Sequence, residues 1–253
     1  MMKTSALTLP AISGIALWLS FPDLSLFPLA WLALVPFIEF CCSEKSIRHI
    51  LVGHLVIGIT YFGGTLYWIP NVLTEYGKLD PVVSAGVFGL LILTQTAFLL
   101  PFTLLTAFTA RVSPGAALWA APGFWILTEL LRTYFPFGGF PWASLGYSQL
   151  PYLWIVQIAD LGSVHLVSFL VVLASSAALG FWKWRSWSYG GVFLALFVAA
   201  NLYGAYRVEV WEPEGTESLR AGLVQGVIEL SAPQEHYAER YLSLIHISEP
   251  TRH

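Results

Sequence analysis

Few residues of this chain have the types and spacing that could carry chemistry. The two cysteines, Cys41 and Cys42, are adjacent and end an apolar segment. Adjacent cysteines have neither the spacing of metal ligands nor the geometry of a disulfide framework, and buried cysteine is usually inert. We therefore interpret both as packing residues, and the sequence predicts no metal site and no cofactor.

Two pairs of ionisable residues interrupt apolar segments, where a charge is costly and suggests a functional role. Glu129 and Arg132 are three residues apart, which places both on one face of a helix, so a local ion pair is the favoured interpretation. The alternative is that Arg132 contacts the head group of a substrate. For Asp160, near His165, a helix–helix hydrogen bond, an interfacial site and a functional role all remain open.

The most unusual stretch is residues 134–149, YFPFGGFPWASLGYSQ, in which six aromatic residues, three glycines and two prolines occur without a charge. Its proline and paired glycine steps disfavour a regular helix, because proline lacks a backbone donor and biases the preceding residue to extended geometry. Tyrosine and tryptophan favour the membrane interface, where the ring lies in hydrocarbon and the polar atom in water. The sequence therefore predicts an irregular interfacial segment between two apolar spans.

The composition indicates an integral membrane protein. Hydrophobic residues make up 57% of the 253 residues and charged residues only 11%, with a mean hydropathy of +0.69. Ordinary soluble domains carry roughly a quarter charged residues. A net charge of −3 and a pI near 6.0 provide no basic surface, so nucleic-acid binding is excluded.

Intervals with at most one charged residue that are long enough to cross about 30 Å of hydrocarbon locate the helices that must position these residues. They predict an α-helical polytopic membrane protein with about seven transmembrane helices in a bundle over residues 1–206. The fourth interval would form about 45 Å of helix, so it must tilt, extend beyond the bilayer or kink, with Pro101 the expected place for a kink. The intervals are residues 4–22, 24–42, 49–70, 81–110, 112–131, 152–182 and 186–206.

The short connections between these intervals predict the orientation, because Lys and Arg are enriched on the cytoplasmic side. One side has six such residues and the other, with Lys78 and Arg132, has two. The N-terminus is therefore expected in the cytoplasm, and residues 134–149 and the C-terminal segment on the outer, periplasmic side. The six residues expected in the cytoplasm are Lys3, Lys45, Arg48, Arg111, Lys183 and Arg185.

Three further polar side chains lie in the apolar intervals. His54 and Gln95 are interpreted as packing groups, because helix interfaces in membranes commonly include polar side chains. Glu39 is expected at the cytoplasmic interface, in contact with water.

The composition changes after residue 206. Residues 207–218 include acidic residues, proline and glycine and are interpreted as a linker. Residues 219–228 resemble a short buried strand, and residues 233–245 have a helical pattern. A soluble domain is therefore expected to begin at residue 219.

Several motifs in order along the chain resemble the apolipoprotein N-acyltransferase family of the bacterial inner membrane. The most specific is GGFPW followed by LGYSQ within residues 138–149. The resemblance extends over residues 7–230. The other matching motifs are FPLAW at 27–31, GTLYW at 64–68, QIAD at 157–160 and AGLVQG at 221–226.

This resemblance implies a membrane bundle that carries a periplasmic α/β domain of the carbon–nitrogen hydrolase, or nitrilase-like, type. In that family a Cys thiolate takes an acyl group from a phospholipid as a thioester, with a Glu as general base and a Lys at the oxyanion. The acyl group then passes to the amine of the diacylglyceryl-cysteine of a lipoprotein. The implied partners are therefore a phospholipid acyl donor, an apolipoprotein acceptor and membrane lipid.

The chain departs from the family towards its C-terminus. The family's Glu, Lys and Cys lie downstream of the first strand of the nitrilase-like domain, so no catalytic residue is assigned, and the chain alone is expected to be inactive. Residues 219–241 are interpreted as the beginning of a truncated nitrilase-like domain. Residues 242–253 resemble a translated sequencing adapter and are interpreted as an artefact.

Residues 134–149 allow two interpretations in this family. They could anchor the protein at the interface, or form a re-entrant arm at a lipid entrance, with Trp142, Tyr147, Gln149 and Arg132 as the substrate-binding candidates. The alternative function is a multi-pass transporter or membrane scaffold without chemistry. A transporter should show repeated halves with paired broken helices, and the sequence shows no convincing repeat.

Overall fold

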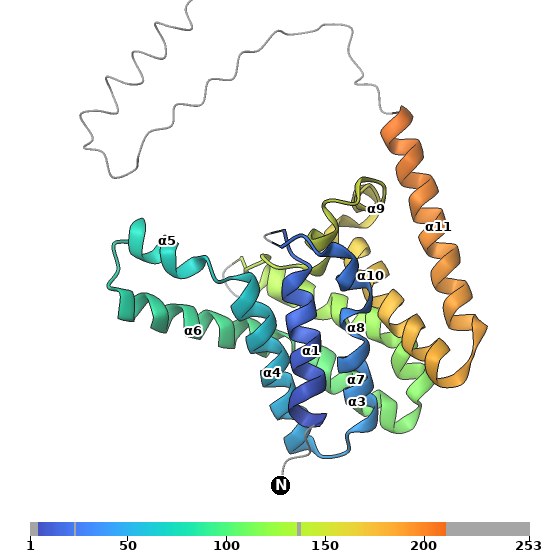
Figure 1. Cartoon of the computed structure of the whole chain (residues 1–253), viewed down its shortest axis with the longest axis horizontal. Helices are drawn as coiled ribbons and strands as arrows, with labels where there is room; N and C mark the ends of the chain where they lie inside the picture. The colour runs from blue at the N-terminus through green and yellow to red at the C-terminus, as the bar shows by residue number, and fades with distance from the viewer. Residues whose placement is uncertain (1–4, 23, 136–137, 211–253) are drawn as a thin grey trace, which may run out of the picture. The chain divides into compact units, whose positions relative to one another are not determined.

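The computed structural model describes residues 5–22, 24–135 and 138–210, which belong to one compact unit of helices (Figure 1). No strand occurs within these ranges. Three predicted parts of the chain lie outside the described residues: 211–218 of the linker, the domain start at 219–241 and the tail at 242–253.

Each of the predicted apolar spans contains helix. Four helices are long and apolar enough to cross a membrane among the residues described, namely α4, the combined α6 and α7, α10 and α11, while α1 and the run from η1 to α3 are shorter. A helical membrane domain is therefore confirmed at this coarser level. The elements are α1 (Ser5–Leu19), η1 (Phe27–Leu29), α2 (Ala30–Ala33), α3 (Val35–Ser43), α4 (Ile47–Thr65), α5 (Ile69–Glu75), α6 (Pro81–Phe98), α7 (Leu100–Val112), α8 (Pro114–Tyr134), η2 (Leu145–Gln149), α9 (Leu153–Val156), α10 (Ala159–Trp184) and α11 (Trp187–Val210).

Prolines explain where two of the predicted spans are broken. The break between α6 and α7 falls at Leu99, two residues before Pro101, so the predicted kink is confirmed. A second break falls at Leu34, two residues before Pro36. Proline cannot donate to the preceding turn and crowds the residue before it, so each helix restarts with proline in its first turn. The last helix continues to Val210, four residues into the predicted linker.

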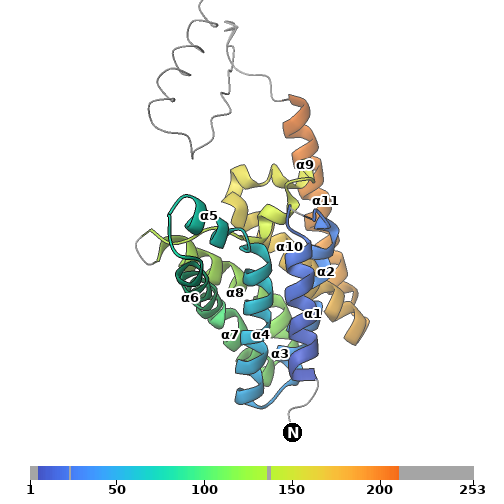
Figure 2. The same ribbon diagram turned by 60° about the vertical axis from the view of Figure 1, so that its left-hand side comes forward.

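Helix α1 packs closely against α4, and the two lie side by side in the bundle (Figure 2). A side chain at Gly14 would overlap Thr60, and one at Gly64 would overlap the ring of Trp18. Small residues at such contacts let helix backbones approach closely, which drives association where lipid removes the hydrophobic effect between helices. Cys41 is buried in the same core, as expected of a packing residue.

One end of the bundle collects the basic residues that the sequence assigns to the cytoplasm. The guanidinium of Arg111 donates to the carbonyl of Lys45 at 3.2 Å, and Lys183 forms an ion pair with Glu39. The side chain of Glu39 is 24% exposed, so it keeps the contact with water that the sequence predicts, although the end of α10 also brings an ammonium group to it.

The opposite end of the bundle is formed where α1, α4 and α8 end, because these three helices run in the same direction (Figures 1 and 2). The segments that follow them, around residues 20–27, 66–80 and 135–152, therefore meet at this end. It contains the described part of the aromatic stretch and a pocket.

Candidate functional site

The aromatic stretch leaves α8 as an irregular loop, as the sequence predicts. Phe135 is extended, and Gly138 and Gly139 have positive φ of 91° and 73°. A Cβ at Gly139 would collide with the carbonyl of Thr133, so the loop can return over the end of α8 only with glycine there. The backbone N–H of Phe140 then donates to the carbonyl of Arg132 at 2.8 Å.

The side chain of Arg132 holds the returning loop through hydrogen bonds to the backbone of the loop. Its guanidinium donates to the carbonyls of Trp142 at 2.7 Å and Ala143 at 3.0 Å, and lies over the ring of Phe62 at 5.3 Å from the centroid. The hydroxyl of Tyr61 also donates to the Ala143 carbonyl, at 2.7 Å. These bonds hold Ala143 at a φ of 62°, a left-handed conformation that is unfavourable for a residue with a Cβ.

Glu129 fixes the next part of the same loop. Its Oε1 accepts from the indole of Trp125 at 2.9 Å and from the backbone N–H of Leu145 at 2.7 Å. Its Oε2 lies 3.1 Å from Nδ1 of His165 on α10. The carboxylate is 1% exposed, so these partners replace the water that it loses on burial.

The predicted ion pair between Glu129 and Arg132 is therefore wrong: Arg132 donates to the loop, and Glu129 contacts the loop, His165 on α10 and Trp125 on α8. The i, i+3 rule considers only the helix on which both residues lie. The loop returns over α8, and its carbonyl and N–H groups are not hydrogen-bonded within a helix or sheet. Buried backbone groups require hydrogen bonds, and the two charged side chains provide them.

Gln149 also supports the loop from inside. It is 0% exposed, and its amide nitrogen donates to the carbonyl of Phe27 at 3.1 Å and lies 2.9 Å from Oγ of Ser148. It therefore joins η2 to η1. Arg132 is likewise only 3% exposed. Both candidates therefore position the loop and do not lie on its surface, where a substrate could contact them.

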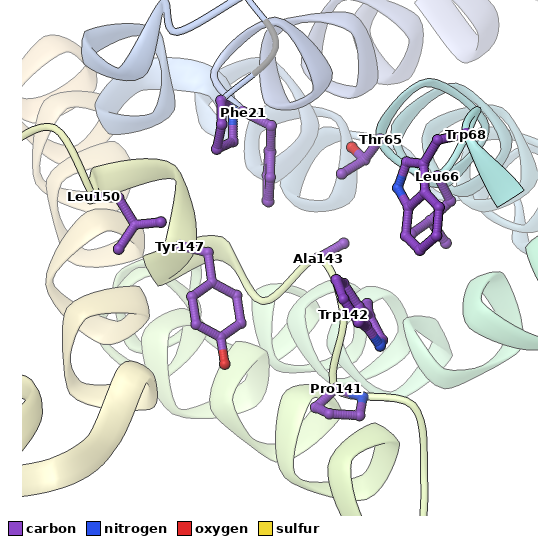
Figure 3. A pocket seen from close by; sticks show the side chains of 10 residues that line it. Phe21, Thr65, Leu66, Trp68, Pro141, Trp142, Ala143, Tyr147 and Leu150 are labelled. Carbon is purple, nitrogen blue, oxygen red and sulfur yellow. The ribbon is translucent and has the colours of Figure 1, made fainter. Parts of the chain in front are cut away.

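The other two candidates, Trp142 and Tyr147, are 56% and 40% exposed and line a pocket of about 560 Å³. Figure 3 shows both side chains on the loop, with Trp142 facing Trp68 from the segment after α4. The ring centroids of the two tryptophans are 5.3 Å apart. The residues that line the pocket are Phe21, Pro22, Thr65, Leu66, Trp68, Pro141, Trp142, Ala143, Tyr147 and Leu150.

Aromatic and aliphatic side chains form most of this pocket, and a few polar atoms are placed among them. The hydroxyl of Thr65 is buried and has no hydrogen-bond partner in the described part of the chain. Such a lining suits an apolar ligand that carries a few polar groups. No cluster of three metal-binding side chains occurs among the described residues, and Cys41 and Cys42 lie at the other end of the bundle.

A family model for the apolipoprotein N-acyltransferase N-terminal domain matches residues 13–177. The chain belongs to this family. Proteins named apolipoprotein N-acyltransferase are similar to it: that of Geobacter metallireducens is 35% identical over 86% of this chain and 42% of its own length, and that of Nitrosomonas europaea 31% identical over 92% and 47%. The chain thus spans less than half the length of these acyltransferase relatives.

The part matched to the N-acyltransferase family includes every residue that lines the pocket and the residues that fix its loop. Sequence reasoning missed Phe21, Leu66 and Trp68 as pocket residues. The family-like motif GTLYW at 64–68 contained the signal for Trp68, but only the fold shows that it faces Trp142.

The remaining polar candidates join helices. The carboxylate of Asp160 accepts from the hydroxyl of Tyr203 at 2.7 Å and lies 3.1 Å from Nε of Arg207, which connects α10 to α11. His54 lies 3.0 Å from the hydroxyl of Thr103, which confirms it as a packing group. Gln95 is buried, as predicted.

Proposed function

We propose that residues 1–210 form the membrane domain of an apolipoprotein N-acyltransferase in the bacterial inner membrane. The pocket end would face the periplasm, and the end with Lys45, Arg111 and Lys183 the cytoplasm, in agreement with the preference of basic residues for the inner side. The proposal rests on membership of the family and on the apolar helices.

The pocket lined by Trp142 is proposed to bind an acyl chain, either of the phospholipid donor or of the diacylglyceryl group on the lipoprotein acceptor. The observation that carries this proposal is the apolar pocket itself, which is built by the most family-specific loop and lies at the end where α1, α4 and α8 terminate. Holding a reacting chain in place lowers the entropic cost of the reaction. The role of this domain would therefore be binding and orientation.

The chemical groups of the reaction, a Cys nucleophile, a Glu base and a Lys at the oxyanion, are assigned by resemblance to a nitrilase-like domain. In such a mechanism the thiolate attacks the phospholipid ester and the lysophospholipid leaves, after which the lipoprotein amine attacks the thioester. The alternative, a transporter or passive scaffold, would not explain the similarity to acyltransferases or the pocket-forming loop typical of this family.

The substitution Trp142→Ala tests the proposed pocket when made at the aligned position of a full-length relative. It removes one wall of the pocket together with the ring contact to Trp68, so kcat/KM for the phospholipid should fall by about tenfold or more, chiefly through a higher KM. Trp142→Phe should retain most activity because an aromatic wall remains. An unchanged kcat/KM of the alanine variant at normal expression would contradict the role of the pocket.

The proposed topology has seven spans. The described α1 and the run from Phe27 to Ser43 are shorter than the roughly 30 Å core, so they require a locally thinner bilayer or tilting of their neighbours. Single cysteines at Lys45 and at Gly138, in a chain with Cys41 and Cys42 replaced by Ala, distinguish the two ends. A membrane-impermeant thiol reagent added to spheroplasts should label position 138 and not position 45, and the reverse labelling would refute the orientation.

A further inference from the structure

A second cavity, of about 740 Å³, lies between η1, α2, α10 and α11. Its lining is apolar apart from the polar atoms of two tryptophans and of Tyr152, whose hydroxyl already donates to Asn201 at 2.8 Å. We refer to this cavity as the α10–α11 groove. It shares no lining residue with the Trp142 pocket. The lining residues are Phe27, Pro28, Trp31, Leu32, Tyr152, Ala174, Ala177, Ala178, Phe181, Trp187, Gly190, Gly191, Phe193, Leu194 and Phe197.

Small residues leave room in the groove where aromatic rings form its sides. A Cβ at Gly190 or Gly191 would meet nothing within 4 Å. Trp31 contacts Phe193 and Phe197 edge-on, at centroid distances of 6.0 and 5.4 Å. Large rings beside glycine and alanine therefore produce a narrow, open channel along α11, the least buried of the candidate spans.

The length of the groove matches one leaflet of a membrane. Along α11 it extends from Trp187 to Phe197, ten residue steps or about 15 Å, which is half of the roughly 30 Å hydrocarbon core. Tyr152 closes the end of the groove nearer the Trp142 pocket, where its ring lies 6.3 Å from the rings of Phe27 and Phe197. A second transmembrane helix would need a groove of full membrane depth.

The end of the groove near Arg185 has the residue types that are typical of a membrane interface. Trp182, Trp184 and Trp187 are all exposed there, and exposed tryptophans concentrate at the level of lipid head groups. Arg185 lies between them, exposed, with its guanidinium 6.0 Å from the ring centroid of Phe181. Within the described residues no carboxylate pairs with Arg185, whereas neighbouring Lys183 is paired with Glu39.

We propose that the α10–α11 groove binds one acyl chain of an anionic phospholipid from the leaflet on the Arg185 side, with the phosphate paired to Arg185. Hydrocarbon fills the channel that protein leaves open between α10 and α11, and the interfacial guanidinium supplies the complementary charge. Such a lipid would fasten α11 to the bundle. The Arg185 end of the groove lies opposite the Trp142 pocket and the two cavities share no lining residue, so the site is distinct from the proposed acyl-transfer site and does not depend on it.

Native mass spectrometry of the full chain, released from nanodiscs of phosphatidylglycerol or phosphatidylcholine, tests the proposal by counting lipids retained. The wild type should retain one phosphatidylglycerol with about fivefold preference over phosphatidylcholine, the selectivity expected from one interfacial cation. Arg185→Gln should abolish that preference. Arg48→Gln, at an exposed arginine of the same end, is the matched control and should preserve it.

Gly191→Leu tests the groove itself, because its side chain would occupy the channel. It should reduce retention of both lipids at least fivefold, whereas Gly86→Leu, at an exposed glycine of α6 with equally open surroundings, should not. Equal retention of the two lipids by the wild type, or unchanged retention in Gly191→Leu, overturns the proposal. The proposal would also be overturned if the wild type formed a dimer without bound lipid and Gly191→Leu dissociated that dimer. Such a result would show that a second copy of the chain fills the groove. If Gly191→Leu does not fold, the comparison of Arg185→Gln with Arg48→Gln decides.

Discussion

Replacing Arg132 by methionine should release the aromatic loop from the end of α8 while the helix bundle remains folded. The substitution removes the two hydrogen bonds to the carbonyls of Trp142 and Ala143 and the contact with the ring of Phe62. Methionine has a comparable length and fills part of the same space, so the main loss is that of the hydrogen bonds and the charge.

The magnitude follows from two opposing contributions. Hydrogen bonds that involve a charged group contribute about 1.5–3 kcal/mol each. Release of Ala143 from its left-handed conformation returns about 1–2 kcal/mol. The two bonds together contribute about 3–6 kcal/mol, so the attachment of the loop should weaken by about 1–5 kcal/mol, which makes its opening roughly 5- to 4000-fold more frequent.

Hydrogen exchange followed by mass spectrometry measures this opening in peptides that cover residues 142–149. The backbone N–H groups of Leu145 and Gly146, which donate to Glu129 and Ser168, should exchange faster by that factor in Arg132→Met. Arg132→Lys should be intermediate, because an ammonium group cannot form the same two-pronged contact.

Arg111→Met is the matched control, since Arg111 also donates to a backbone carbonyl, that of Lys45, and lies over a ring, that of Phe108. It is exposed, so its loss should change stability by less than about 1 kcal/mol and leave the loop protected. Equal exchange of residues 142–149 in Arg132→Met and wild type would refute the reasoning that Arg132 holds the loop.

Two further predictions concern the loop and the opposite end of the bundle. Gly139→Ala should destabilise the domain more than Gly138→Ala in thermal unfolding, because both have positive φ but only the first places a methyl group against the carbonyl of Thr133; equal losses would show that this close approach is unimportant. The pKa of Glu44 is lowered, chiefly because the backbone N–H of Ser46 donates to its carboxylate. Its contribution to stability is therefore present above the ordinary carboxyl pKa of about 4.3 and is lost as the pH falls through the lowered value. The difference in Tm between wild type and Glu44→Gln should be larger at pH 7 than at pH 3, and a constant difference would contradict the assignment.

Several features of the fold could be predicted because they depend on local sequence. Intervals with at most one charged residue located the helices approximately, since charged side chains are costly in hydrocarbon whatever the fold. Pro101 marked the break between α6 and α7, and the proline and glycine steps marked the irregular loop. Seven spans and the orientation stay predictions.

The site could be predicted only in part. Trp142 and Tyr147 were identified from their residue types in an uncharged aromatic loop, and the pocket contains both. Gln149 was identified as part of the same loop and Arg132 as a charged residue in an apolar segment, yet both are buried beneath the loop. Residue type indicates which side chains could contact a lipid, but not which ones the returning loop covers.

The sequence by itself determined that this is a helical membrane protein with a family-specific aromatic loop, because composition and motif order do not depend on the fold. Only the tertiary structure decided how that loop is held. Glu129 and Arg132 satisfy its backbone rather than one another, and Trp68 meets Trp142 across a pocket. These contacts join residues from different helices, and their partners follow from where the chain returns, which spacing along one helix cannot determine.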